Sequence, residues 1–243
     1  GEAKHFSVVD PASVLCEAKR LLGRKFSDPE VRTDRARWLF KVVEGPNDRP
    51  MVEVQWKGRA QRFFAEELLA MVLAKMKAMA EARLGHPVSS ATIGVPACFN
   101  KAQRQATRDA GTIAGLNVLR LHNEPELAAV AYGMRPGIGS AAAERWILVL
   151  DVGACFSSAS VVTLEDGITD VKAVSGESRV GGSDFDERLV EYFADQLQQE
   201  RDLDVRRFPC AMQRLRTACE RVKRKLSVSG EATVEVESLM EGV

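Results

Sequence analysis

A short apolar run, followed at once by an acidic residue and a glycine, constrains this chain more than any other feature. Residues 147–150 are four apolar residues in a row, rich in branched side chains, and they predict a strand buried on both faces. Asp151 stands where that strand should end, and Gly153 follows it among small residues. A carboxylate beside a tight turn at the end of a central strand suits a metal or phosphate site. The alternative is an aspartate that caps an ordinary turn.

The charge balance and the cysteines exclude several classes of protein. Lysine plus arginine equal aspartate plus glutamate at 34 each, so the chain lacks the basic excess that nucleic-acid or membrane-surface binding needs, and we expect neither partner. No apolar run reaches the length of a membrane span. The five cysteines are scattered without a CxxC pair, so we expect no disulfide framework, no zinc site, and a reducing, cytoplasmic location.

The pattern of apolar residues predicts two groups of helices and strands, separated by a Pro- and Gly-rich linker at 135–140. Before the linker we expect helices at 12–25, 66–84, 101–114 and 126–132, and strands at 51–56, 59–64, 91–95 and 118–121. Beyond it we expect strands at 146–152, 157–164 and 168–175, helices at about 183–197 and 210–226, and strands again from Ala232. In the helix at 66–84, a buried stripe is expected at Leu69, Val72, Met76 and Ala80.

The final helix carries a polar face beside its apolar one. Glu220, Lys223 and Ser227 recur on the polar face, and Arg224 lies four residues after Glu220. This face is either solvated, with Glu220 and Arg224 as an ion pair, or a groove wall that meets a ribose or base. In the second interpretation Arg224 can stack on an aromatic ring.

Two adjacent glycines, Gly181 and Gly182, precede the helix expected at about 183–197. They form either an ordinary turn or a place where backbone N–H groups approach a phosphate. Ser183 and Asp186, which follow them, fit a weak capping box at the start of that helix.

The common nucleotide-binding and nucleophile motifs are missing from the sequence. The chain contains neither GxxxxGK[ST] nor GxGxxG, which excludes the common phosphate loops. A serine nucleophile is not expected either, because Ser157, Ser158 and Ser160 lack a GxSxG context and a nearby histidine.

Several longer stretches are more specific than any of these signals. They are AKRLLGRKF at 18–26, QRQAT at 103–107, DAGTIAGLNVLR at 109–120, NEP at 123–125, GGSDFD at 181–186 and RLRTACER at 214–221. Through these stretches the chain resembles the nucleotide-binding domain of the 70-kilodalton heat-shock chaperone family. The resemblance covers nearly the whole chain from about Glu17.

The resemblance implies an α/β, actin-like ATPase fold, in which two lobes on ribonuclease-H-like sheets bind ATP and Mg²⁺ between them. It assigns 1–136 to the first lobe, with a peripheral subdomain to about 63 and half of the core at about 64–136. The second lobe would take 141–243, with core to about 180 and a peripheral subdomain beyond. We expect the fold to be incomplete at both ends: a first phosphate-binding hairpin would lie upstream, and the rest of the second lobe and a peptide-binding domain downstream.

The resemblance also implies roles for single residues. Lys19 matches a lysine that faces the terminal phosphate. Glu124 matches the carboxylate that helps to place magnesium and the attacking water, and Asp151 the aspartate at the metal's water shell, so both would reach the metal through water. The other matched positions would bind nucleotide: Gly153, Ala154, Cys155 and Phe156 in one phosphate loop, Gly181 and Gly182 in another, and Glu220, Lys223, Arg224 and Ser227 in an adenosine wall.

The loop after Asp151 departs from the family pattern. Of three family glycines only Gly153 is kept, while Phe156 replaces a threonine and Ser158 replaces an aspartate. Side chains at former glycines crowd a loop that works by close backbone approach. We therefore expect a divergent chaperone-family domain that binds ATP or ADP with impaired hydrolysis. The alternative is a non-catalytic pseudo-ATPase module that binds co-chaperones or partner domains without nucleotide.

Overall fold

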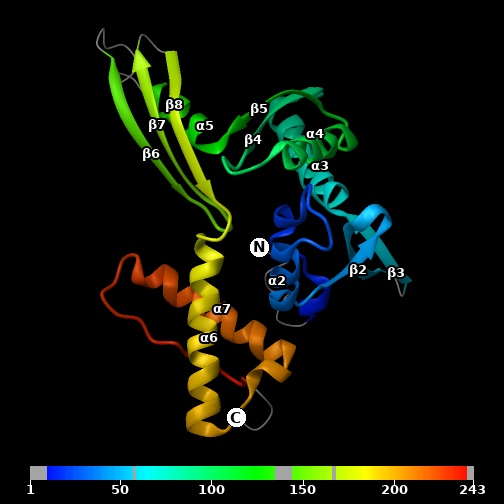
Figure 1. Ribbon diagram of the computed structural model, residues 1–243, viewed down its shortest axis with the longest axis vertical. Helices are drawn as coiled ribbons and strands as arrows, with labels where there is room; N and C mark the ends of the chain where they lie inside the picture. Colours follow the sequence, from blue (N-terminus) through cyan, green and yellow to red (C-terminus); the bar gives the residue numbers. More distant parts are fainter. Residues whose placement is uncertain (1–9, 57–58, 135–143, 166–167, 240–243) are drawn as a thin grey trace.

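Three separate sheets, with helices between and beside them, make up the computed structural model of this α/β chain (Figure 1). The structure describes residues 10–56, 59–134, 144–165 and 168–239, so the predicted linker at 135–140 lies outside the described residues. Among the described helices, none is both long enough and apolar enough to cross a membrane.

An antiparallel sheet of β1 (Lys41–Gly45), β2 (Arg49–Trp56) and β3 (Arg59–Phe64) forms the first layer. The β2–β3 hairpin confirms the prediction, whereas β1 was not predicted. Val52 of β2 lies opposite Val42 of β1 and is fully buried in the first hydrophobic core. Alternating apolar residues on β2 therefore do face a core, as the period of two requires.

A parallel strand pair with a crossover helix follows. β4 (Ser90–Val95) and β5 (Asn117–Asn123) are joined through α4 (Lys101–Ile113), and α3 (Ala65–Leu84) packs against α4. Asn100 caps α4: its side chain accepts the Gln103 N–H at 3.0 Å, and the Gln103 side chain accepts the Asn100 N–H at 3.0 Å. This β–α–β unit ends in α5 (Glu124–Gly133), which starts directly after β5.

The second half of the chain combines an antiparallel sheet with two helices. The strands β6 (Arg145–Val152), β7 (Ser157–Glu165) and β8 (Ile168–Glu177) lie in that order, and α5 packs against them. Figure 1 shows α6 (Gly182–Arg201) continuing away from β8, with α7 (Pro209–Leu226) beside it. Leu215 and Cys219 of α7 and Val190 of α6 form a second buried core.

The prediction of an N-terminal helix at 12–25 is wrong. The segment forms two short 3-10 turns, η1 (Pro11–Ser13) and η2 (Ala18–Leu21). Glu17 interrupts it, because its φ of 54° is left-handed and no right-handed helix continues through such a residue. The helix proper is α2 (Pro29–Arg37), and the Asp28 side chain caps it by accepting the Glu30 N–H at 3.0 Å.

The prediction that β6 is buried on both faces is also wrong. Trp146, Leu148, Leu150 and Val152 are between 63 and 68% exposed, whereas the residues between them are half-buried. The reason is that β6 is an edge strand and α5 packs against the sheet from one side, while the described residues leave the other face open. A run of apolar residues shows that both faces of a strand can be buried, but it does not determine whether other elements cover both faces.

Two further expectations fail for a similar reason. Val72 and Met76 of the expected α3 stripe are 55 and 60% exposed, because α3 packs through a different face, which carries Leu68. No strand forms from Ala232 among the described residues, where 231–236 has no regular structure. A strand needs a partner strand for its backbone hydrogen bonds, and none pairs with this segment in the described part of the chain.

One glycine places the end of η2 against α4. Gly23 has a φ of +62°, and a Cβ built on it would lie 2.5 Å from the Gln103 backbone nitrogen. Gly85, which ends α3, has a similar φ of +76° but has no neighbour within 4 Å of such a Cβ. Both positions therefore need a residue that tolerates a positive φ, but only Gly23 also lacks room for a side chain.

We predict that Gly23→Ala destabilises the chain more than Gly85→Ala. The left-handed backbone alone should cost about 1 kcal/mol at both positions, and the clash with α4 should raise the loss at Gly23 to about 3 kcal/mol. The free energy of unfolding, measured in urea, checks this. Equal losses would mean that η2 is not held tightly against α4.

Candidate functional site

A cavity of about 740 Å³ lies between the two halves of the chain. Residues 14–17 and 37–40 line it from the first half. Residues 152–154, the first turn of α6 and one face of α7 line it from the second half. A cavity of this volume that is shared by two parts of a chain is the usual setting of a small-molecule site.

The polar face of α7 forms one wall of this cavity. Arg216, Glu220, Lys223 and Arg224 all line it, as the 3.6-residue period allows. Arg224 also pairs with Glu220 at 2.8 Å, as the first interpretation expects, and both residues line the cavity. Contact of this wall with a ribose or base stays a prediction. The Arg224 side chain remains 73% exposed and therefore keeps a guanidinium face open to a ligand. Ser227 is exposed after the end of α7 and does not line the cavity.

Lys223 ties α7 to the start of α6. Its ammonium lies 2.6 Å from an Asp186 carboxylate oxygen and donates to the Gly182 carbonyl at 2.7 Å. The expected capping box of Ser183 and Asp186 is wrong, because Asp186 is engaged with Lys223. The Asp184 carboxylate instead accepts the Gly181 N–H at 3.0 Å, and the helix begins one residue early.

The glycine pair before α6 packs against the loop that follows β6. The Gly182 N–H donates to the Gly153 carbonyl at 2.9 Å, and the Ser183 N–H donates to the Ala154 carbonyl at 2.8 Å. A Cβ on Gly181 would lie 2.5 Å from the Ala154 oxygen. The close backbone approach that glycine permits is therefore made to the protein's own loop.

The Phe156 ring turns away from this loop toward the first hydrophobic core. It meets the Phe99 ring edge-to-face, with centroids 5.5 Å apart, and the Arg20 guanidinium lies 5.8 Å from its centroid. Burial raises the pKa of the neighbouring Cys155 thiol, an effect that nearby Arg20 opposes. Neither Phe156 nor Cys155 lines the cavity.

Two of the predicted catalytic residues contact each other. The Lys19 ammonium lies 2.6 Å from a Glu124 carboxylate oxygen, and both side chains are about one-third exposed, at 33 and 32%. The ammonium also lies 5.9 Å from the Phe99 ring centroid. This pair joins η2 to the first residue of α5, but it does not line the cavity.

The third predicted catalytic residue, Asp151, does not belong to a cluster of metal-ligating side chains among the described residues. It is half-buried near the end of β6, opposite Ser158 of β7, and does not line the cavity. Within the described ranges, no three His, Cys, Asp or Glu side chains gather to hold a metal. The role predicted for Asp151 and Glu124, which would reach magnesium through water, needs no such cluster and stays a prediction.

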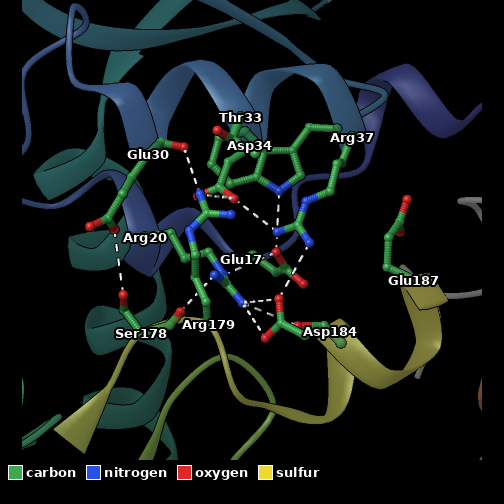
Figure 2. A network of polar contacts seen from close by, with 12 residues as sticks. Glu17, Arg20, Glu30, Thr33, Asp34, Arg37, Ser178, Arg179, Asp184 and Glu187 are labelled. Atoms are coloured by element: carbon green, nitrogen blue, oxygen red, sulfur yellow. Dashed lines mark hydrogen bonds and ion pairs between the residues drawn. The ribbon is translucent and has the colours of Figure 1, made fainter.

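A buried network of arginines and carboxylates borders the cavity and was missed by sequence reasoning (Figure 2). Arg20, whose side chain is only 4% exposed, lies 3.0 Å from an Asp184 carboxylate oxygen and donates to the Ser178 carbonyl at 2.8 Å. Arg37 of α2 contacts the same Asp184 at 3.3 Å. These contacts join the first half of the chain to the start of α6.

Asp34 of α2 forms the second centre of this network. It contacts Arg37 at 2.8 Å and Arg179 at 3.2 Å (Figure 2). Burial raises the pKa of Asp34, while the surrounding arginines oppose that shift. The contacts between the two halves join residues 145 to 164 positions apart in sequence, so only the family-like stretches 18–26 and 181–186 could have pointed to them.

Comparison with known proteins places this geometry in context. The family model described as "Hsp70 protein" matches residues 1–243. The chain is 46% identical over 242 residues to the Heat shock cognate 70 kDa protein 3 of Dictyostelium discoideum, covering 99% of this chain and 38% of that protein. It is 46% identical to the Heat shock 70 kDa protein of Neurospora crassa, covering 99% of this chain and 37% of that protein. It is 47% identical to a ribosome-associated molecular chaperone of Eremothecium gossypii, covering 99% of this chain and 39% of that protein. The chain thus spans less than two fifths of these relatives.

We predict that Arg20→Ala lowers the free energy of unfolding by about 3 kcal/mol, because the Ser178 carbonyl loses its donor and Asp184 keeps only Arg37 and the Gly181 N–H. Arg207→Ala is the matched control: Arg207 pairs with Asp204 at 3.0 Å but is 79% exposed, so its loss should stay below about 1 kcal/mol. Urea unfolding of both variants makes the comparison. Similar small losses would show that the network does not hold the two halves together.

Proposed function

The chain belongs to the Hsp70 family, and on that premise we propose that it is a divergent nucleotide-binding domain with an adenine-nucleotide pocket in the cavity described above. The proposal includes the actin-like ATPase fold, with lobes at 1–136 and 141–243 on either side of the cavity. It also includes a chaperone context and a cytoplasmic location. The α/β architecture and the position of the cavity between the two halves support it.

The observation that carries this proposal is the α7 wall. Three of the four residues that the family resemblance assigns to the adenosine, Glu220, Lys223 and Arg224, line one cavity together. Trp38 lines the same cavity from the first half. An exposed guanidinium and an indole can both stack on a purine, while carboxylates accept hydrogen bonds from ribose hydroxyls.

Hydrolysis is proposed to be weak or absent. Phosphoryl transfer needs the terminal phosphate, the metal and the attacking water to be held in line by placed donors. Here Lys19 and Glu124 neutralise each other, and Phe156 stands where the family has a hydroxyl. Within the described ranges no three His, Cys, Asp or Glu side chains gather into a direct metal site, and no step through magnesium is derived.

A second candidate is a pseudo-ATPase module that binds co-chaperones or partner domains without nucleotide. The open apolar face of β6, which carries Trp146 and Leu150, favours this candidate. Val72 and Met76 on α3 add a second exposed apolar surface. Contiguous exposed apolar surface is typical of protein interaction sites. ADP binding discriminates between the two candidates.

We predict that Arg224→Ala weakens ADP binding about fivefold, which corresponds to about 1 kcal/mol of lost stacking and charge. Arg221→Ala is the control, because Arg221 is an exposed arginine of the same helix that does not line the cavity. Calorimetric titration with ADP measures both. If the two variants bind ADP equally well, the adenosine assignment is wrong; if the unmodified chain binds no ADP, the pseudo-ATPase candidate is favoured.

ATP turnover by the chain should lie at the uncatalysed background, since each missing phosphate donor costs about 10²–10³ in rate. Single-turnover hydrolysis of radiolabelled ATP measures this directly. A rate well above background that is lost again in Glu124→Gln would contradict the prediction, because it would show that Glu124 acts on the attacking water despite its ion pair with Lys19.

A further inference from the structure

We propose that the cavity selects an adenine nucleoside over the corresponding nucleoside triphosphate, because its phosphate end is closed by the protein's own groups. This inference rests on the proposed function, in that it takes the cavity to be the adenine site. It differs from that proposal in naming the form of the ligand. Four features of the described residues support it.

Four backbone donors of the two glycine-bearing loops are already used, those of Gly153, Gly181, Gly182 and Ser183. The N–H groups of Gly182 and Ser183 donate to the carbonyls of the loop after β6, at 2.9 and 2.8 Å. The Gly153 N–H donates to the Phe156 carbonyl at 2.9 Å, and the Gly181 N–H donates to Asp184. A phosphate that takes hydrogen bonds from these four groups would have to break their present bonds, and each buried group left without its partner costs about 1–3 kcal/mol.

Each cationic residue of the described cavity lining is paired with a carboxylate. Arg216 contacts Glu187 at 3.0 Å, Lys223 contacts Asp186 at 2.6 Å, and the pairs of Arg37 and Arg224 are given above. Among the described residues, four cationic and four carboxylate residues line the cavity, so the formal charge of this described lining is zero. A triphosphate, with several negative charges, gains little from a neutral, internally paired wall.

The lysine expected at the terminal phosphate is not available to it. The Lys19 ammonium contacts Glu124 at 2.6 Å and does not line the cavity. Beside it, the Phe99 and Phe156 rings pack edge-to-face between the loop and the first core. Aromatic surface thus occupies the place between these elements where the resemblance puts a phosphate and its hydroxyl donor.

The remaining part of the cavity suits an uncharged ring with hydroxyl groups. Trp38 stacks on Phe40 with ring centroids 5.0 Å apart, and both line the cavity. Arg224 lies on the α7 wall with its side chain mostly exposed. The carboxylates of Glu187 and Glu220 can accept ribose hydroxyl donors. The cavity volume of about 740 Å³ is ample for a nucleoside.

The test is a calorimetric titration of the chain with adenosine, ADP and ATP at physiological salt, each with and without Mg²⁺. We expect adenosine to bind at least as tightly as ATP, and Mg²⁺ to leave the order unchanged. ATP that binds tenfold or more tightly than adenosine would overturn this inference and leave the proposed function standing. No measurable binding of any of the three would overturn both.

A double variant tests the cause of the selectivity. Glu124→Gln with Phe156→Thr releases Lys19 and replaces the ring by a hydroxyl, and it should improve ATP binding about fivefold relative to adenosine. The control makes the same two substitutions at Glu191 and Phe185, which are exposed on α6 and outside the cavity, and should leave the ratio unchanged. An unchanged ratio in the folded double variant would overturn the proposed cause. If the double variant fails to fold, the ligand order of the unmodified chain decides the inference.

Discussion

The contact between Arg20 and Asp184 is the interaction on which the candidate site depends. It places a guanidinium that is almost fully buried between η2 and the first turn of α6. A buried charge of this kind is costly to desolvate and is stable only when its partners stay in place. Because Arg20 also holds the Ser178 carbonyl, the contact fixes the chain that leads into α6 and, with it, one edge of the cavity.

The loop after β6 links that network to the first hydrophobic core. Its carbonyls accept the N–H groups at the start of α6, and Phe156 packs its ring against Phe99. An aromatic side chain buries far more apolar surface than a threonine, so the substitution strengthens packing between the halves. The family resemblance places a hydroxyl that faces a phosphate at this same position. Under the proposed function, packing at this junction and phosphate binding would therefore require different side chains at position 156.

β6 and α3 each carry an apolar face that the described residues leave exposed to solvent. Trp146 and Leu150 on one surface, and Val72 and Met76 on the other, are more than half exposed. Side chains of this kind gain stability whenever another surface removes them from water, at about 25 cal/mol per Å². These two faces are therefore the apolar surfaces on which the pseudo-ATPase proposal depends.

The sequence by itself determined the family and most of the local elements, although not β1 or the two short turns that replace the helix expected at 12–25. The period of two at β2, the capping box of Asn100, the apolar stripe of α7 and the family-like stretches are all properties of neighbouring residues, which interact through short-range geometry. The tertiary structure alone decided that Lys19 pairs with Glu124, that Phe156 packs into the first core, and that one face of β6 stays open. The reason is physical: periodicity identifies a face that can be buried, but the layer that covers it and the charge that neutralises a cation come from other elements, 105 positions away in the case of Lys19 and Glu124.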